Sequence, residues 1–325
     1  MTRLDVPQQP DEEPPAVSVS HPDPAALTPW VPGQRRKEEP ARRGRKAEPV
    51  SSNAGPCHQA WLASLRGRFT DSGYTLDELA DLTGFSKTRL SVLLRGEESY
   101  PSWNLTYCVI RALGIPVTPG RRLWSVGAQE AKKTPAWIER RIHEVRPLDP
   151  ETPPLALKAL REAMRDPYTR YTRALLQSQR ADWLVLETFD LLWLDWDTAT
   201  SSPDVRRYAW ELLRGRVWRR ALRNTEGQLD LRQAAFSTVG QSRIEDPEDC
   251  FAEISEISAF FELLGHLQPD QIDIVVLRYL CGLGTGDLPN VVGLSPAAVH
   301  TLDHHARGAL QRLHHRHDDP GATAP

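Results

Sequence analysis

The chain has 325 residues, of which 40% are hydrophobic and 26% charged, and its net charge is -3 at pH 7. This composition is typical of a folded protein, and the balanced charge excludes a polycationic nucleic-acid coat. The first residues lack the apolar core of a secretory signal, and no stretch reaches the roughly 18 uncharged apolar residues of a membrane helix. The four cysteines lie far apart, which argues against disulfides or a zinc site. We therefore expect a cytoplasmic protein without membrane partner, metal or cofactor.

Composition divides the chain into tails, linkers and three blocks of helical periodicity. Residues 1–55 contain ten prolines and few aliphatic side chains, too little apolar surface to offset the entropy of ordering. From Trp61 onward, apolar residues recur at helical spacing between Pro and Gly, and strand signals are scarce. We expect an all-α protein with these parts: a disordered tail 1–55, a helical block 56–127, a connecting helix and linker 128–154, a helical block 155–224, a linker 225–250, a helical block 251–317 and a disordered tail 318–325.

Two segments, 79–90 and 288–299, share one pattern at one spacing. Apolar residues occupy the first, fourth, seventh and last positions, with Gly at the sixth and Ser at the eighth. Gly permits the positive φ that ends one helix, and Ser caps the next helix, so the pattern predicts two helix-turn-helix units. Such units commonly bind DNA, although tight helical corners also occur in proteins that do not.

In the first copy, the second helix is predicted from Ser86 to about Arg95. Leu90, Leu93 and Leu94 would form its buried stripe, so its other side carries donors suited to phosphates and base edges. The alternative is a solvated charged face on a small helical bundle. The DNA-binding residues expected here are Thr75, Ser86, Lys87, Thr88, Arg89, Ser91 and Arg95.

The first block carries the motifs TLDELA at 75–80, GFSKT at 84–88, LLRG at 93–96 and YPSW at 100–103. With these motifs the block resembles the XRE (Cro/C1-type) helix-turn-helix family. The resemblance implies a five-helix DNA-binding domain with residues 86–95 in the major groove. Because XRE domains often bind as dimers, a homodimer is an open alternative.

The middle block has two oppositely charged segments. Residues 182–204 contain six acids and no base, whereas residues 206–223 contain seven arginines and one acid. The acidic segment is predicted to form an amphipathic helix that attracts a basic partner. Basic and aromatic side chains on the second helix suit nucleic acid, but the two helices could equally pack together through complementary charge. The DNA-binding residues expected on the basic helix are Arg214, Arg216, Arg219, Arg220 and Arg223.

A second resemblance rests on WLVLETFDLLW at 183–193, YAWELLRGR at 208–216 and the pattern of residues 267–310. These segments resemble regions two and four of extracytoplasmic-function (ECF) sigma factors, in the family's order. The resemblance implies two small helical sigma-like domains. In region two, the acidic helix would contact core RNA polymerase through Asp182, Glu187 and Asp190. In region four, the second helix-turn-helix would contact DNA through Ser295, His300, Thr301, His304 and Arg307.

The third block departs from that pattern in three ways. Pro289 is tolerated only if its helix begins near Gly286 or Asp287. Asp303 occupies an apolar position, and we expect a slight rotation of the helix that puts Leu302 in its place. Histidines replace the usual basic residues, and neutral imidazole attracts phosphate weakly, so we expect poor DNA binding by this block alone.

Histidines are frequent between 300 and 317, and His300 and His304 are four residues apart. That spacing can hold a metal on a helix, but no third ligand shares the face, so we expect solvated side chains.

No nucleotide-binding loop or hydrolase motif is present, so we do not expect an enzyme. The function expected is that of a bacterial transcriptional regulator that binds double-stranded DNA and contacts RNA polymerase through its sigma-like part. One alternative is a functional ECF sigma factor that directs initiation. Another is a protein-interaction scaffold or polymerase decoy without DNA recognition.

Overall fold

A computed structural model describes residues 50–51, 54–97, 100–145, 151–176, 178–223, 229 and 263–318. Over these ranges the chain is helical and has no strand, which confirms the expected all-α class. None of the helices in the described ranges is both long enough and apolar enough to span a bilayer. The expected tails and the linker 225–250 lie almost entirely outside the described residues.

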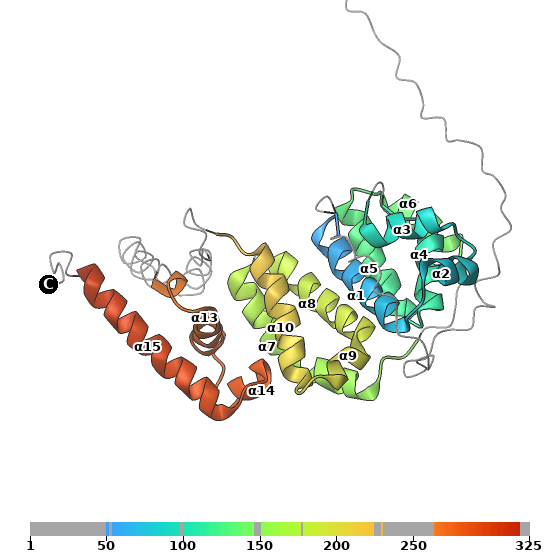
Figure 1. Cartoon of the computed structure of the whole chain (residues 1–325). Helices are drawn as coiled ribbons and strands as arrows, with labels where there is room; N and C mark the ends of the chain where they lie inside the picture. The colour runs from blue at the N-terminus through green and yellow to red at the C-terminus, as the bar shows by residue number, and fades with distance from the viewer. Residues whose placement is uncertain are drawn as a thin grey trace, which may run out of the picture.

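Six helices build the described part of the N-terminal block (Figure 1). They are α1 (Pro56–Ser72), α2 (Leu76–Thr83), α3 (Lys87–Arg95), α4 (Trp103–Ala112), α5 (Val117–Glu130) and α6 (Pro135–His143). The connecting helix expected within 128–154 is α6, which begins later than residue 128 because α5 extends to Glu130 and Lys132 adopts a positive φ of 60°. The Thr134 hydroxyl then caps α6.

The rest of the described chain forms a second group of helices. They are α7 (Leu155–Leu175), α8 (Ser178–Leu194), α9 (Trp196–Ser201), α10 (Val205–Arg220), α13 (Pro269–Val275), the π-helix η2 (Val276–Leu280), α14 (Leu288–Val292) and α15 (Pro296–Asp318). One continuous apolar cluster runs from Leu157 on α7 to Ala306 on α15. The expected boundary at 225–250 therefore does not separate two cores.

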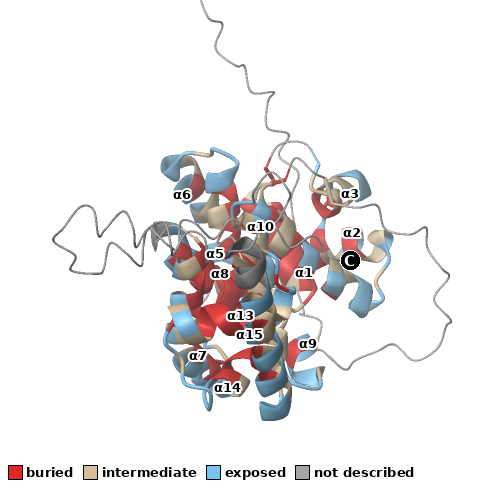
Figure 2. Cartoon of the chain, turned by 90° about the vertical axis from the view of Figure 1, so that its left-hand side faces the viewer, coloured by how far each residue is buried: buried red, intermediate tan, exposed pale blue. Residues whose placement is uncertain are grey.

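Helix α8 belongs to two cores at once, and its neighbours cover it on several sides (Figure 2). Its residues Val185, Phe189 and Leu192 pack into the larger cluster. Leu191 and Leu194 pack into a separate cluster formed by the N-terminal block. Because a helix that is apolar on more than one side is buried, α8 joins the two groups of helices rather than presenting one solvent-exposed acidic face.

A buried ion pair fixes α10 against α8. Arg216 on α10 is 1% exposed, and its guanidinium donates to the Glu187 carboxylate on α8. Arg220 lies 3.8 Å from the same carboxylate and 3.7 Å from that of Glu130 on α5. Burial raises the pKa of Glu187, and the two arginines oppose that rise. The charges compensate one another inside the protein, where an unpaired charge would be costly.

A second set of polar contacts attaches the N-terminal block to α8 and α9. The Arg122 guanidinium on α5 forms two hydrogen bonds with the Asp190 carboxylate. On α1, the Ser64 hydroxyl donates to Asp195 at 2.8 Å, and Arg68 pairs with Asp197 at 2.7 Å. These acids are thus held by the chain's own basic and hydroxyl groups.

The second helical corner packs directly on α10. Gly293 ends α14 with a φ of 64°, and a Cβ atom added there would clash with the backbone nitrogen of Arg207. A side chain at this position would meet backbone, which cannot move aside as the end of a flexible side chain can. Arg206 reinforces the contact, donating to the Asn290 side chain at 2.7 Å.

We predict that Glu187→Gln lowers the free energy of unfolding by about 3 kcal/mol, because it leaves Arg216 buried without a charged partner. Asp182→Asn on the same helix removes an exposed ion pair with Arg173 and should cost less than about 1 kcal/mol. Urea denaturation of both variants measures the difference. Equal losses of unfolding free energy in the two variants would show that the buried pair stabilises the protein no more than the exposed pair does.

Candidate nucleic-acid interface

The first predicted corner is formed by α2 and α3, and interactions between residues close in sequence stabilise its turn. The Thr75 hydroxyl accepts from the Glu78 amide, and the Glu78 carboxylate accepts from the Thr75 amide, which caps α2. Gly84 ends α2 with a φ of 70°. The Ser86 hydroxyl then caps α3, and buried Phe85 fills the corner. The positions of Gly84, Phe85 and Ser86 match the sequence prediction.

The two sides of α3 differ as predicted. Leu90, Leu93 and Leu94 are buried in the N-terminal core. The residues expected to contact DNA lie on the opposite side: Ser86, Lys87, Thr88 and Arg89 are exposed, and Ser91 and Arg95 are partly exposed. Thr75 is also exposed, but its hydroxyl is engaged in the α2 cap.

Two cations on the outer side of α3 have acidic neighbours. The Lys87 ammonium pairs with Asp77 on α2, and both side chains are about 60% exposed. Arg95 pairs with Glu97 at 2.8 Å and also donates to the Ser91 hydroxyl. Exposed pairs of this kind contribute only about 0–1 kcal/mol, so an arriving phosphate can replace the carboxylates at small cost.

Three of the α10 arginines expected to contact DNA are paired with acidic groups of the protein, although only Arg216 among them is buried. Arg214 pairs with buried Asp273 and stacks 4.5 Å from the Trp218 ring centroid. Arg216 and Arg220 face Glu187, as described above. Arg219 is exposed but donates to the Gly215 carbonyl of its own helix.

The basic DNA-reading face expected of α10 is therefore not present as a surface. Arg214, Arg216 and Arg220 are engaged in ion pairs, and only Arg219 and Arg223 of the expected set are exposed. Packing of the two helices through complementary charge, the alternative reading of this block, describes α8 and α10 as the structure has them.

The expected polymerase-contacting acids are also divided between inside and outside. Glu187 and Asp190 are buried in ion pairs with Arg216 and Arg122. Asp182 is exposed and pairs with Arg173 at 2.8 Å. Of these three acids, only Asp182 is exposed and therefore accessible to another protein.

The second corner, α14 and α15, keeps the predicted turn. Asp287 precedes α14, so Pro289 falls in its first turn, where its missing amide costs nothing. The Ser295 hydroxyl accepts from the Ala298 amide. On α15, His300, Thr301, His304 and Arg307 are exposed together with Ser295, as expected for an outward face.

The expected rotation of α15 is wrong. Asp303 itself lies in the buried stripe and is 3% exposed, whereas Leu302 packs against the core only partly buried. Two arginines compensate its charge, since both Arg278 on η2 and Arg307 donate to the Asp303 carboxylate. An ion-pair cluster thus replaces the apolar contact, and the helix has no need to turn. Among the described residues, no three His, Cys, Asp or Glu side chains come together as a metal site.

Sequence reasoning missed the contacts that attach the N-terminal block to α8 and α9. The acidic partners of its arginines Arg68 and Arg122 follow 129 and 68 residues later in the sequence. The one available signal was the excess of acids within 182–204, a segment that contains no base of its own. Such an excess indicates that a partner exists but not where it lies.

Comparison with known proteins identified no relative of this chain. The chain matches no protein-family model, no curated protein and no solved structure. The case for a function therefore depends on the geometry described above.

A buried polar cluster formed by Tyr171 on α7, Arg214 on α10 and Asp273 on α13 should make the free energy of unfolding depend on pH. Burial raises the pKa of Asp273 to about 6, and nearby Asp270 adds to the rise. Arg214 opposes the rise, and so does the Tyr171 hydroxyl, which donates to Asp273 at 2.5 Å. Because the folded-state pKa lies above the ordinary value of 3.8, this group's contribution is present at low pH and is lost as the pH rises through about 6.

We predict that Asp273→Asn removes this loss. Relative to the wild type, the variant's free energy of unfolding should rise by up to about 3 kcal/mol between pH about 4 and about 7. Denaturant titrations at the two pH values measure the change, and the comparison cancels the other buried carboxylates. Parallel pH dependences would contradict the assignment.

Proposed function

We propose that the chain is a bacterial transcriptional regulator that binds duplex DNA through the outer side of α3. The observation that carries the proposal is the two-sided α3 helix: its leucines are buried, whereas Lys87, Thr88, Arg89, Ser91 and Arg95 are exposed or partly exposed. Cations, hydroxyls and a capped helix N-terminus on one surface suit phosphate and base-edge contacts. The α2–α3 corner agrees in its turn residues with the helix-turn-helix resemblance.

The inward arginines of α10 weigh against a sigma factor that reads its promoter through this helix. Arg214, Arg216 and Arg220 would have to leave four acidic partners before they reached DNA. In this proposal, DNA affinity therefore comes from α3. A contact with RNA polymerase would use the exposed end of α8, where Asp182 adjoins Trp183, which is 64% exposed.

We predict that Lys87→Ala combined with Arg95→Ala abolishes specific DNA binding, because both cations are expected to contact phosphate or base edges. Fluorescence anisotropy with duplexes selected from a random-sequence pool measures the affinity over a range of salt concentrations. The remaining non-specific binding should show a log–log salt slope reduced by about 2, one unit for each lost contact.

The matched control is Lys158→Ala with Arg165→Ala, which removes two exposed cations from α7. This variant carries the same net charge but leaves α3 intact, so its affinity should stay close to that of the wild type. If both double variants bind DNA as the wild type does, α3 is not the DNA-binding element. If both lose affinity equally, only overall charge matters and the assignment fails.

Asp77→Asn should strengthen DNA binding about two- to fivefold, because Lys87 no longer has to leave an ion pair worth up to about 1 kcal/mol. Asp81→Asn is the control, since it removes the same charge from α2 at another exposed position. The same anisotropy assay compares the two. An equal gain in both variants would mean that the Lys87–Asp77 pair plays no part.

A further inference from the structure

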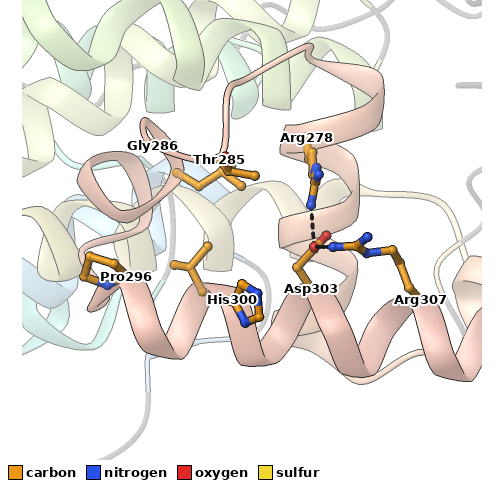
Figure 3. A pocket seen from close by; sticks show the side chains of 9 residues that line it. Arg278, Thr285, Gly286, Pro296, His300, Asp303 and Arg307 are labelled. Carbon is orange, nitrogen blue, oxygen red and sulfur yellow. Dashed lines mark hydrogen bonds and ion pairs between the residues drawn. The ribbon is translucent and has the colours of Figure 1, made fainter.

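A cavity of about 430 Å³ lies beside the second corner, where α15, η2 and the loop before α14 meet (Figure 3). Leu288 and Val299, both buried, and the Pro296 ring give it apolar walls. The side chains of Arg278, His300 and Arg307 line the remaining wall, and the cavity is partly open to solvent. Its volume falls in the range that holds small organic molecules.

The charged wall carries a surplus of positive charge. Arg278 and Arg307 donate to the same oxygen of Asp303, so two cations share one anion and the cluster has a net charge of +1. Asp303 is nearly inaccessible, whereas the Arg307 side chain is 50% exposed and that of Arg278 is 25% exposed. Each guanidinium keeps N–H groups that Asp303 does not occupy. The accessible charge is therefore positive.

Further donors surround this charge. The Thr285 hydroxyl has no hydrogen-bond partner among the described residues, and it lies across the cavity from α15 (Figure 3). Gly286 beside it leaves open space, because a Cβ atom added there would meet nothing within 4 Å. The His300 ring offers a nitrogen that can donate or accept. Donors thus outnumber accessible acceptors, as a site for an oxyanion requires.

We propose that this cavity binds a phosphate group, with its oxygens held by Arg278, Arg307 and Thr285 and the body attached to it lying against Leu288 and Val299. Arginine pairs recognise phosphate through several charge-assisted hydrogen bonds. A phosphate group also presents more acceptor oxygens to these donors than the two oxygens of a carboxylate. The group belongs either to a small organic phosphate or to the DNA backbone. The site is remote in sequence from α3 and does not depend on DNA binding by that helix.

Isothermal titration calorimetry of the full chain with phenyl phosphate tests the small-molecule source. We expect binding that phenol does not reproduce, and we expect Arg307→Gln to weaken it about tenfold or more. Arg312→Gln is the matched control, because Arg312 is exposed on the same helix but does not line the cavity. Its affinity should equal that of the wild type.

The same variants distinguish the DNA source. If phenyl phosphate does not bind, but Arg307→Gln reduces the salt slope of duplex binding by about 1 and Arg312→Gln does not, the phosphate belongs to DNA. If Arg307→Gln affects neither phenyl phosphate nor duplex binding, or Arg312→Gln affects each equally, the proposal is overturned.

A second substitution protects the test against misfolding, since Arg307 also compensates the buried Asp303. Thr285→Val removes the hydroxyl from an exposed loop and leaves the arginine cluster intact. It should weaken binding of the same phosphate probe severalfold with an unchanged melting temperature. Unchanged binding in Thr285→Val, together with unchanged binding in a folded Arg307→Gln protein, would contradict the site.

Discussion

The buried Arg216–Glu187 pair is the constraint on which the described structure depends, because it fixes α10 to the helix that both cores share. Helix α8 packs apolar residues into each core and places Glu187 and Asp190 toward arginines on either side. Burying these charges is costly unless each has a partner. The arrangement therefore specifies which helices can lie against α8, and it ties the N-terminal block to the rest of the chain.

This constraint decides which surfaces are left for a partner. Glu187 and Asp190 of α8, and Arg214, Arg216 and Arg220 of α10, are engaged in ion pairs within the protein. Neither helix therefore keeps the strongly charged face that its composition indicates. On α3, Lys87 and Arg95 pair with the exposed acids Asp77 and Glu97, which water and phosphate can replace at little cost. The difference between buried and exposed pairs is the physical reason for assigning DNA contact to α3. At the second corner, buried Asp303 likewise needs charged partners, and the two arginines that pair with it lie at the edge of a cavity.

The elements that the sequence predicted well are those specified by neighbouring residues. Gly84, Ser86 and the leucines of α3 act within one turn of helix, and so do Pro289 and Ser295 in the second corner. The ion pairs were not predictable in this way, because Arg122 and Asp190 are 68 residues apart and Arg216 and Glu187 are 29 apart. Periodicity identifies a polar face, but it does not identify what covers that face. Asp303 was misplaced for the same reason, because its compensating Arg278 lies on another helix.

Hydrogen–deuterium exchange of the full chain, with and without a duplex selected for binding, tests the central claim most directly. Helices α3 and α10 differ in sequence and place, so their peptides report separately on the two candidate DNA-binding elements. DNA contact through α3 predicts slower exchange in peptides that cover residues 86–97, with peptides of 205–220 unchanged. Slower exchange in 205–220 without any change at 86–97 would contradict the account, because the arginines of α10 would then have left their internal partners to bind DNA.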